Sequence, residues 1–545
     1  MKNLLFALLI GILFTNTAFT QSETDAGKNK KYENKPERKE WLKDNGFGMF
    51  IHFGVDAQLG TVISHSLVGA SEEYVERYFN ELPESFNPSK FDADRIAKLA
   101  KRAGMKYIVF TTKHHSGFCM WDTETTDFNI MNTPYGQDMV KQYVEATREQ
   151  GLDVGFYYSP EDFHFLYEHD ITISRRQFKQ AISPSLKQEY HQFIRDQISE
   201  LFTNYGKIDL LFLDGDYEEP AKNTAWKLQP DVLVTRGALE TPEQTIPGNP
   251  MEEAWETCMT LGTQWQFKPT NEKYKDGTRM IEILSEIRSK GGSLLLNVGP
   301  DPYGVIPNGQ ENVLREMGAW NFINGEAMFD VRPWIVPNEK NIIFTRSKNA
   351  NTVYGIITNE EDWEHGERKQ FTVRSIESTE NTKVTVLGQN DRVLEYNPEV
   401  VPETHFKQRG DRLTVSAVRA QRIYNNRKWP NPVVLKFTNV RPALEPPRVN
   451  TEEINEEEGY IKISVEDMGD QEKLKLSYEY RPYAGFVEEL YHDDWKTSSN
   501  SITIDDPGEY TIDITEEMQK THQIRAVALH PKVNIYGGIL RGQLE

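Results

Sequence analysis

Several features that define common protein classes are scarce or missing in this chain of 545 residues. Only two cysteines are present, Cys119 and Cys258, so the fold does not depend on a disulfide framework. We interpret them as buried free thiols, with a bridge between them as the alternative. The 83 acidic residues outnumber the 62 basic ones, which gives a formal net charge of -21. Such a chain repels phosphate backbones, so nucleic acid is excluded as a probable partner class.

Long apolar runs are missing after the first twenty residues, so the sequence predicts no membrane span in the mature protein. Leu4–Phe14 is an apolar run that follows Lys2 and precedes the small residues of Ala18–Thr20. About eleven apolar residues are too few to cross a bilayer but are typical of a cleavable signal peptide. We therefore expect residues 1–20 to be a signal peptide. No cysteine for a lipid anchor lies near the cut, so the protein is expected to be exported, either periplasmic or secreted.

What is present fits a folded, multi-domain protein. A hydrophobic fraction of 38% over this length predicts two or three domains after a flexible lead-in at residues 21–37. Over residues 38–332, short apolar runs alternate with amphipathic helical stretches, which is typical of parallel strands with helical crossovers. The length and the number of repeats favour an α/β fold with a (β/α)8-like barrel as the catalytic domain. The expected strands cover residues 47–54, 106–112, 153–159, 208–213, 232–235 and 294–298.

The pattern becomes β-rich after about residue 330. Residues 333–440 are expected to form a β-sandwich domain, and residues 447–545 a small C-terminal β-module. A proline-rich stretch at 442–447 and an acidic run at 452–458 predict a linker between them. These β-modules either bind glycan or simply pack against the catalytic domain.

Acidic side chains in two apolar contexts are candidate catalytic groups. Asp214 directly follows the apolar run Ile208–Leu213, at the strand end where barrel enzymes carry their chemistry. The alternative is a strand-terminating Asp-Gly turn. Glu256 has apolar and aromatic neighbours of the kind that raise a carboxyl pKa, and an exposed loop acid is the alternative. Hydrolysis of a glycoside with retention needs two carboxyl groups about 5 Å apart, one as nucleophile and one as acid/base.

Histidines stand at the ends of two expected strands. His52 ends the first, and the pair His114-His115 follows the second. Uncharged imidazoles donate or accept hydrogen bonds from sugar hydroxyls. Zinc is the alternative, but no cysteine or carboxylate completes a ligand set at a familiar spacing. We therefore expect neither a metal nor a cofactor.

Seven short motifs follow one another in order between about residues 40 and 330. They are Phe50–Gly54, Lys113–Phe118, Gly155–Ser159, Asp209–Gly215, Trp255–Cys258, Gly292–Pro300 and Gly318–Ala327. Together they resemble glycoside hydrolase family 29, the α-L-fucosidases. The resemblance implies a barrel-like catalytic domain followed by a β-sandwich. It also implies a retaining exo-α-L-fucosidase that removes terminal fucose from an oligosaccharide or polysaccharide through a covalent fucosyl-enzyme.

The resemblance carries site roles onto individual residues. It places the nucleophile on Asp214 and the acid/base on Glu256, with Glu72 and Glu253 as alternative proton donors. It implies sugar contacts from His52, Glu72, His114, His115, Tyr158, Arg236 and Trp265.

Three positions depart from the family pattern and bear on substrate preference more than on reaction type. Phe53 replaces a tryptophan, Glu73 replaces a second tryptophan, and Trp265–Phe267 replaces a tryptophan-glycine-tyrosine motif. An apolar patch that receives the C5 methyl of fucose discriminates against a hydroxymethyl by only about 1–3 kcal/mol. An α-L-galactosidase or a related 6-deoxy-sugar glycosidase is therefore the nearest alternative. A non-catalytic glycan-binding protein is a further one, which predicts loss of a catalytic carboxylate.

Overall fold

The computed structural model describes residues 32–423, 430–455, 457–482, 495–514 and 522–541. The expected signal peptide at residues 1–20 and most of the expected lead-in lie outside these ranges. Within them, every helix is too short or too polar to cross a bilayer.

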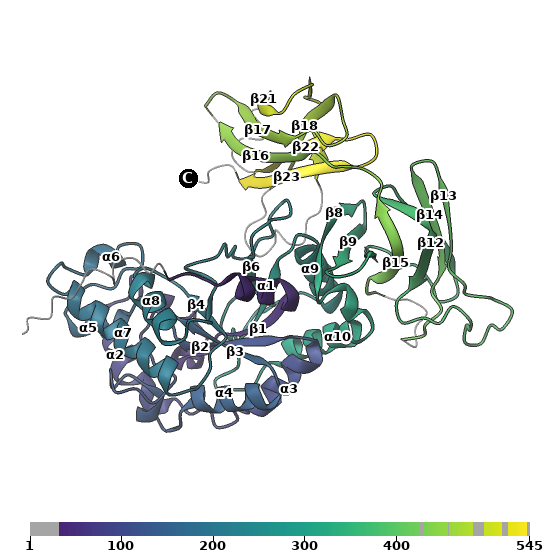
Figure 1. Ribbon diagram of the computed structural model, residues 1–545. Coiled ribbons are helices and arrows are strands. Elements are labelled where there is room, and N and C mark those ends of the chain that lie inside the picture. The colour runs from purple at the N-terminus through teal and green to yellow at the C-terminus, as the bar shows by residue number, and fades with distance from the viewer. Residues whose placement is uncertain (1–31, 424–429, 456, 483–494, 515–521, 542–545) are drawn as a thin grey trace, which may run out of the picture.

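The first part of the chain is a curled sheet of seven parallel strands with helices around it (Figure 1). The strand order is β5-β4-β3-β2-β1-β7-β6. The bounds are β1 Phe47–Ile51, β2 Tyr107–Lys113, β3 Asp153–Tyr158, β4 Leu210–Leu213, β5 Leu233–Val234, β6 Glu256–Thr260 and β7 Ser293–Val298. Every strand residue except Asp153 is buried, because the sheet is covered on both faces. The expected α/β, barrel-like class is confirmed, with seven strands in the described ranges rather than eight.

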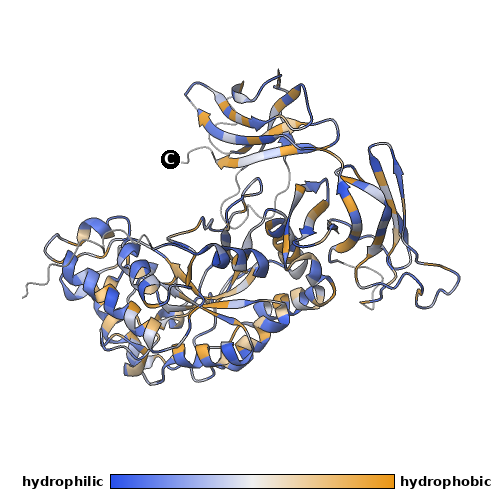
Figure 2. Ribbon diagram, viewed as in Figure 1, coloured by the Kyte–Doolittle hydropathy of each residue, from blue (hydrophilic) through white to orange (hydrophobic). Residues whose placement is uncertain are grey.

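Amphipathic helices cover the outside of the sheet (Figure 2). Their bounds are α1 Pro36–Asn45, α2 Glu72–Asn80, α3 Ala93–Ala103, α4 Met139–Glu149, α5 Phe163–Glu168, α6 Phe178–Ala181, α7 Lys187–Thr203, α8 Glu218–Leu228, α9 Gly277–Ser289 and α10 Asn308–Asn324. Helix α3 shows why these residues form a helix. The Asp92 side chain accepts the Arg95 backbone N–H at its start, and Gly104 ends it in the left-handed region at φ 93°. Its buried face packs against α10 and α4 and belongs to the apolar core that includes the sheet.

Strand β6 was not expected from the sequence, and the edge beside it is irregular. Instead of pairing with β5, β6 receives the segment 240–244, which lies parallel to it through two isolated bridges, Glu240 to Trp255 and Glu243 to Cys258. The Cys258 N–H donates to the Pro242 carbonyl at 3.2 Å. This short segment therefore extends the sheet at the edge of β6 that β7 leaves open, where a further barrel strand would be.

The rest of the described chain is antiparallel. One five-stranded and one three-stranded sheet enclose an apolar core of their own. Their strands are β8 Val331–Glu339, β9 Ile342–Ser347, β10 Thr352–Ile357, β11 Arg368–Val373, β12 Ile376–Val386, β13 His405–Arg409, β14 Arg412–Val418 and β15 Val433–Pro442. This is the arrangement expected of a β-sandwich.

A third core is enclosed by the last strands (Figure 1). They are β16 Arg448–Asn455, β17 Tyr460–Asp467, β18 Leu474–Pro482, β19 Lys496–Thr497, β20 Ile502–Ile504, β21 Gly508–Asp513, β22 His522–Leu529 and β23 Asn534–Arg541. We call this unit the C-terminal module. The acidic run expected to be linker is strand at its beginning, because residues 452–455 belong to β16, paired with β17.

Candidate active site

A pocket lies at the C-terminal ends of the parallel strands, where barrel folds place their chemistry. Its lining consists of Phe50, His52, Ile63, His65, His114, Tyr157, Arg175, Phe212, Asp214, Arg236, Glu243, Cys258 and Trp265. The expected site residues found in this lining are His52, His114, Asp214, Arg236 and Trp265. Asp214 and Glu243 are the only carboxylates among the described residues that line it.

Asp214 is positioned by the end of β4 and by the turn that follows. Its backbone N–H donates to the Tyr158 carbonyl at the end of β3, at 3.3 Å. Gly215 then turns the chain at φ 111°, and a Cβ there would lie 2.7 Å from the Glu161 side chain. Only glycine fits this turn, which leaves the Asp214 side chain aimed into the pocket and 16% exposed.

Cationic and hydroxyl groups surround the Asp214 carboxylate. Arg236 Nη1 and Arg175 Nη2 lie 3.2 Å and 3.5 Å from Oδ1, and the Tyr157 hydroxyl donates to Oδ2 at 3.0 Å. Burial raises the pKa of Asp214, but the two guanidinium groups and this hydroxyl together hold the pKa well below its usual range. The group is therefore an ionised carboxylate, the form that a nucleophile needs.

The three expected histidines are buried and uncharged. Burial lowers the pKa of His52 to about 4 and of His115 to about 3, and it lowers the pKa of His114 well below its usual value. Each Nδ1 faces a fixed partner: Asn297 Oδ1 at 2.7 Å for His52, Ser64 Oγ at 2.8 Å for His114, and Ser159 Oγ at 2.6 Å for His115. In His52 and His114, which line the pocket, Nε2 is left as the nitrogen for a ligand. His115 is 1% exposed and is not in the lining, so its expected sugar contact is not supported. The His115 Nε2 lacks a protein partner within hydrogen-bond distance.

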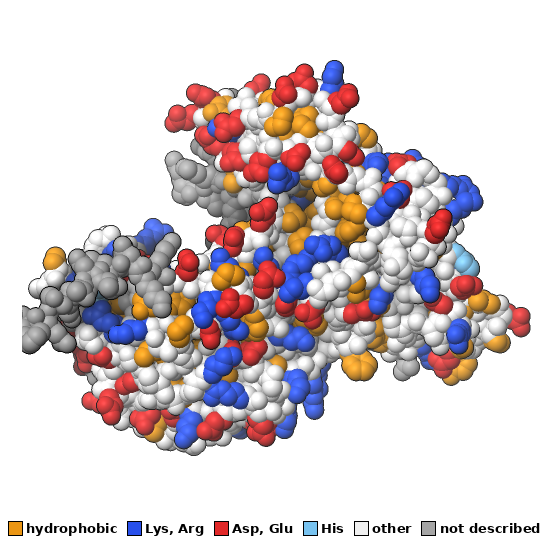
Figure 3. Space-filling view, viewed as in Figure 1, with side chains coloured by type: hydrophobic (Ala, Val, Ile, Leu, Met, Phe, Trp, Pro, Cys, Tyr) orange, Lys and Arg blue, Asp and Glu red, His pale blue; other side chains and the backbone are white. Residues whose placement is uncertain are grey.

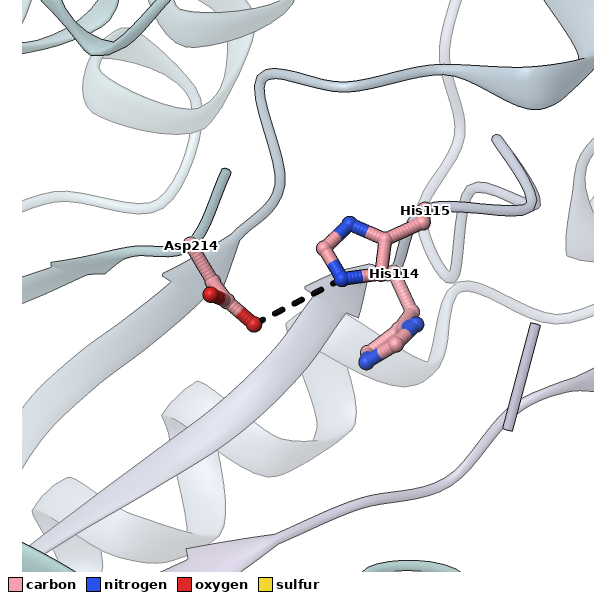
Figure 4. A group of neighbouring side chains, drawn as sticks. All are labelled: His114, His115 and Asp214. Carbon is pink, nitrogen blue, oxygen red and sulfur yellow. Dashed lines mark ion pairs between the residues drawn. The ribbon is translucent and has the colours of Figure 1, made fainter. Parts of the chain in front are cut away.

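His114, His115 and Asp214 come close enough to raise the question of a metal. Potential ligand atoms of the three lie within 4.8 Å of one another, and one His115 nitrogen points at the Asp214 carboxylate at 3.6 Å (Figure 4). The carboxylate that the sequence spacing did not supply is thus present in space. However, Asp214 already faces two guanidinium groups, which repel a divalent cation at this position. The expectation that the site works without a metal therefore stays a prediction.

The choice of Tyr158 over Tyr157 is wrong. Neighbouring strand residues face opposite sides of a sheet, and Tyr157 is the one that points into the pocket and binds Asp214. Tyr158 faces the surrounding helices, where its hydroxyl donates to Gln197 Oε1 at 2.7 Å. The sequence motif contains both residues, and only the register of β3 distinguishes them.

Arg236 links Asp214 to a second carboxylate. While its Nη1 contacts Asp214, its Nη2 donates to Glu243 Oε2 at 3.0 Å. Glu243 lies in the irregular segment beside β6, and its side chain is 42% exposed, so solvent and a leaving group can reach it. The sequence offered no signal for this residue, because it follows no strand and belongs to no recognised motif.

The expectation that Glu256 faces Asp214 in the pocket is wrong. Glu256 is the first residue of β6 and is 0% exposed, whereas Cys258, two residues further on the same face, lines the pocket. Its carboxylate accepts the Tyr107 hydroxyl, which also lies 2.7 Å from Ser293 Oγ. Burial raises the pKa of Glu256 to about 7. Glu256 is thus sealed one layer beneath the pocket floor and cannot reach a leaving group.

Neither alternative proton donor reaches the pocket. Glu72 lies exposed at the start of α2 and is not in the pocket lining, so its expected sugar contact is also wrong. Glu253 is exposed and pairs with Lys39 at 2.9 Å. Both positions were inferred from nearby motifs rather than from strand ends.

Two cationic or imidazole side chains of the pocket were missed altogether. Arg175 comes from the chain between α5 and α6, and His65 from a short 3-10 turn at His65–Leu67. Arg175 Nη1 lies 3.2 Å from His65 Nε2, and its Nε lies 3.8 Å from the buried Glu161 carboxylate. Loops carry both residues, so no periodicity in the sequence marks them.

The buried position of Glu256 predicts a role in stability rather than in proton transfer. A carboxyl with a pKa near 4.5 when unfolded and about 7 when folded makes the free energy of unfolding fall as the pH rises from 4.5 to 7. Glu256→Gln should remove this dependence, which amounts to at most about 3 kcal/mol. Unfolding in urea at pH 5 and pH 8 measures it. Turnover by the variant should fall by less than about tenfold, equally for good and poor leaving groups. A loss confined to poor leaving groups would contradict this placement.

Known proteins with similar sequences and folds share one description. The sequence profile of the family described as "Alpha-L-fucosidase" matches residues 13–326. The alpha-L-fucosidase of Branchiostoma floridae is 30% identical over 393 residues, which cover 64% of this chain and 84% of that protein. The alpha-L-fucosidase of Dictyostelium discoideum is 27% identical over 363 residues, or 58% of this chain and 77% of that protein. The solved structure of alpha-L-fucosidase isoenzyme 1 from Paenibacillus thiaminolyticus is 29% identical, with a TM-score of 0.60 over 74% of this chain and 99% of that one.

Proposed function

Because this chain belongs to the alpha-L-fucosidase family, we propose that it removes terminal α-L-fucose with retention, with Asp214 as nucleophile and Glu243 as acid/base. Family membership makes the protein a glycoside hydrolase whose substrate is a fucosylated glycan. Identifying the two carboxylates and the retaining course is our own inference from the geometry of the pocket.

The observation that carries the proposal is the shared guanidinium of Arg236. Its Nη1 lies 3.2 Å from Asp214 and its Nη2 lies 3.0 Å from Glu243. Both carboxyl groups therefore contact a single guanidinium, which keeps them near each other in the pocket. Retaining enzymes use a separation of about 5 Å, and inverting enzymes roughly 6.5–9.5 Å so that a water can enter between carboxylate and sugar.

In the first step, an Asp214 oxygen attacks the anomeric carbon while the bond to the leaving oxygen breaks. The Glu243 carboxyl gives its proton to that oxygen, so the aglycone leaves as a neutral alcohol. The fucosyl group remains attached to Asp214 as an ester.

In the second step, Glu243 accepts a proton from a water molecule, and that water oxygen attacks the anomeric carbon. The ester bond breaks, Asp214 regains its negative charge, and fucose leaves with its original configuration. The Tyr157 hydroxyl and the guanidinium groups stabilise the carboxylate that is released.

Sugar recognition falls to the neutral histidines and to the apolar lining. With Nδ1 fixed by a neighbour, the rings of His52 and His114, which line the pocket, offer Nε2 to hydroxyl groups of the sugar. The lining also includes apolar and aromatic side chains suited to the C5 methyl group, namely Phe50, Ile63, Phe212 and Trp265. This mixture of fixed polar groups and apolar walls is usual for a small-molecule site.

The family assignment supports a fucosidase rather than an α-L-galactosidase. A non-catalytic binding protein would be expected to lack one carboxylate of the pair, and the pocket contains two.

Product stereochemistry tests the proposed course of the reaction. An aryl α-L-fucoside is incubated with the protein in an NMR tube, and the anomeric proton of the first product is recorded before mutarotation. We expect α-L-fucose to form first. Initial formation of β-L-fucose would rule out the covalent route and with it the role of Asp214 as nucleophile. The L-galactose analogue should turn over more slowly, because the apolar lining disfavours its hydroxymethyl group.

We further propose that the enzyme acts outside the cytoplasm. The basis is the sequence pattern at residues 1–20, which is typical of a cleavable signal peptide.

A further inference from the structure

A second, larger cavity lies between the β-sandwich and the C-terminal module. Its volume is about 750 Å³, which is within the range of ligand-binding clefts. The turn between β8 and β9 and the ends of β11 and β14 form one wall, while β18, β22 and β23 form the other. The described residues that line it are all different from those of the active-site pocket. We call it the inter-module cleft.

Direct contacts fix the two walls of the inter-module cleft to each other. Arg374 Nη1 donates to the Pro531 carbonyl at 3.4 Å, and Lys532 Nζ donates to the Ala443 carbonyl at 2.5 Å. Val533, from the turn between β22 and β23, is buried in the core of the β-sandwich. The cleft is therefore a built feature of the fold rather than a gap between two loosely joined units.

Cationic side chains predominate in the lining of the cleft. They are Lys340, Arg374, Arg412, Arg525 and Lys532. Among the residues that the structure describes, the lining holds two carboxylates, and both have structural partners. Glu339 accepts the backbone N–H groups of Arg374 and Ser375 at 2.8 Å each, and Glu479 accepts from Arg525 at 2.7 Å. From outside the lining, Asp411 approaches Arg374 at 3.4 Å and Arg412 at 4.0 Å. Five cations therefore face three carboxylates among the described residues, which still leaves cations in excess.

The positive charge of the cleft is opposite in sign to the net charge of the whole protein. The whole chain carries a net charge of -21, and acidic side chains gather over the face of the C-terminal module that Figure 3 shows. Lys340 and Arg412 are exposed. A cluster of cations in a concave site focuses the local field and attracts anions despite the overall charge.

Aromatic rings lie beside these cations. The Arg525 guanidinium is sandwiched between the rings of Trp495 at 4.1 Å and Tyr536 at 3.8 Å. Both rings line the cleft and are half-buried. Flat apolar surface next to guanidinium groups suits a sugar ring that carries an anionic substituent, because the ring stacks while the cations bind the charge.

We propose that the inter-module cleft is a second carbohydrate site, which binds a segment of acidic glycan bearing sulfate or carboxylate groups. The choice of a glycan rests on the proposed function, since a fucosidase meets its substrate as part of a larger saccharide. A neutral glycan would not need this excess of cations, and the aromatic rings beside them suit a saccharide. Binding at this cleft raises the concentration of fucosyl ends around the enzyme without altering the reaction at Asp214.

Titration calorimetry with a sulfated oligosaccharide and its desulfated counterpart tests the proposal. The variant is Lys340→Gln/Arg412→Gln, which removes two exposed cations and keeps a polar side chain at both positions. Its matched control is Lys407→Gln/Arg409→Gln, which removes two exposed cations from β13, outside the cleft. We expect the sulfated ligand to bind the cleft variant about tenfold more weakly and the control variant unchanged. The desulfated ligand should bind all three proteins at least about tenfold more weakly than the sulfated ligand binds the unmodified protein.

Turnover of a small aryl fucoside, measured in parallel, should be equal in all three proteins and reports that the variants are folded. Equal affinity for both ligands, or an equal loss in the control variant, would overturn the cleft as an anion site. Binding of a single-stranded oligonucleotide, but not of the sulfated glycan, would overturn the ligand class. If the unmodified protein binds the sulfated glycan but does not turn over the aryl fucoside, the proposed function is contradicted and the proposal for the cleft still stands.

Discussion

Asp214→Ala is expected to lower turnover of an aryl α-L-fucoside by roughly 10⁴-fold or more, because no other group in the pocket can form the ester. The carboxylate is held ionised by Arg236, Arg175 and Tyr157, and the remaining carboxylate, Glu243, lies on the other end of Arg236. The histidines of the pocket lack the negative charge that stabilises the developing cation. Steady-state kinetics on the purified variant measures the loss.

Chemical rescue distinguishes loss of the nucleophile from damage to the fold. Azide can enter the space left by the carboxylate and attack the anomeric carbon from the same side, so β-L-fucosyl azide should accumulate. Asp216→Ala is the matched control, since it makes the same change two residues along the chain, outside the pocket lining. It should retain turnover within about threefold. Failure of azide to restore any activity, or formation of the α-azide, would contradict the assignment of Asp214.

Glu243→Ala is expected to separate substrates by their leaving groups. The aglycone of a natural glycan is a poor leaving group that needs a proton, so turnover of such a substrate should fall by roughly 10²–10⁴-fold. A dinitrophenyl fucoside leaves without protonation, so its first step should be nearly unaffected. The fucosyl-enzyme should then accumulate, since no base activates water. A burst of dinitrophenol followed by slow turnover measures both effects.

The same variant offers a stereochemical check. Azide needs no base, so it should attack the accumulated fucosyl-enzyme and give α-L-fucosyl azide, the opposite anomer from that expected with Asp214→Ala. Glu240→Ala is the matched control, because it removes an exposed carboxylate three residues earlier in the same segment. It should behave like the unmodified enzyme with both substrates. If Glu243→Ala slows the two substrates by the same factor, the proton comes from another group.

The sequence predicted the sheet and the part of the site that the sheet carries. Apolar runs marked six of the seven strands, and the strand-end rule was sufficient to place His52, His114 and Asp214 at one pocket. These positions follow from hydrophobic periodicity, which a single sequence contains. Strand β6 was missed because its polar residues, Glu256, Thr257 and Thr260, hide the apolar pattern.

The wrong predictions share one physical cause. The register of a strand sets which way each side chain points and how deep in the fold it lies. Tyr157 and Tyr158 are adjacent residues of the same type, but Tyr157 faces the pocket and Tyr158 faces the helices. Glu256 and Cys258 share a face of β6 and differ only in height, which places one beneath the floor and the other in the lining. Glu243 and Arg175 come from irregular chain, where position is determined by contacts distant in sequence.

The proton donor and the nucleophile are held in place by different kinds of structure. Asp214 ends a strand paired to neighbours in the barrel, so its position is locked by the whole sheet. Glu243 belongs to the segment 240–244, five residues that are joined to the edge of the sheet at β6 by two isolated bridges. An insertion or deletion in that segment would bring a different residue to the leaving-group oxygen and leave the barrel intact. In a sequence alignment of relatives, we therefore expect the nucleophile to occupy one aligned position. The proton donor instead has to be identified from the structure of each relative.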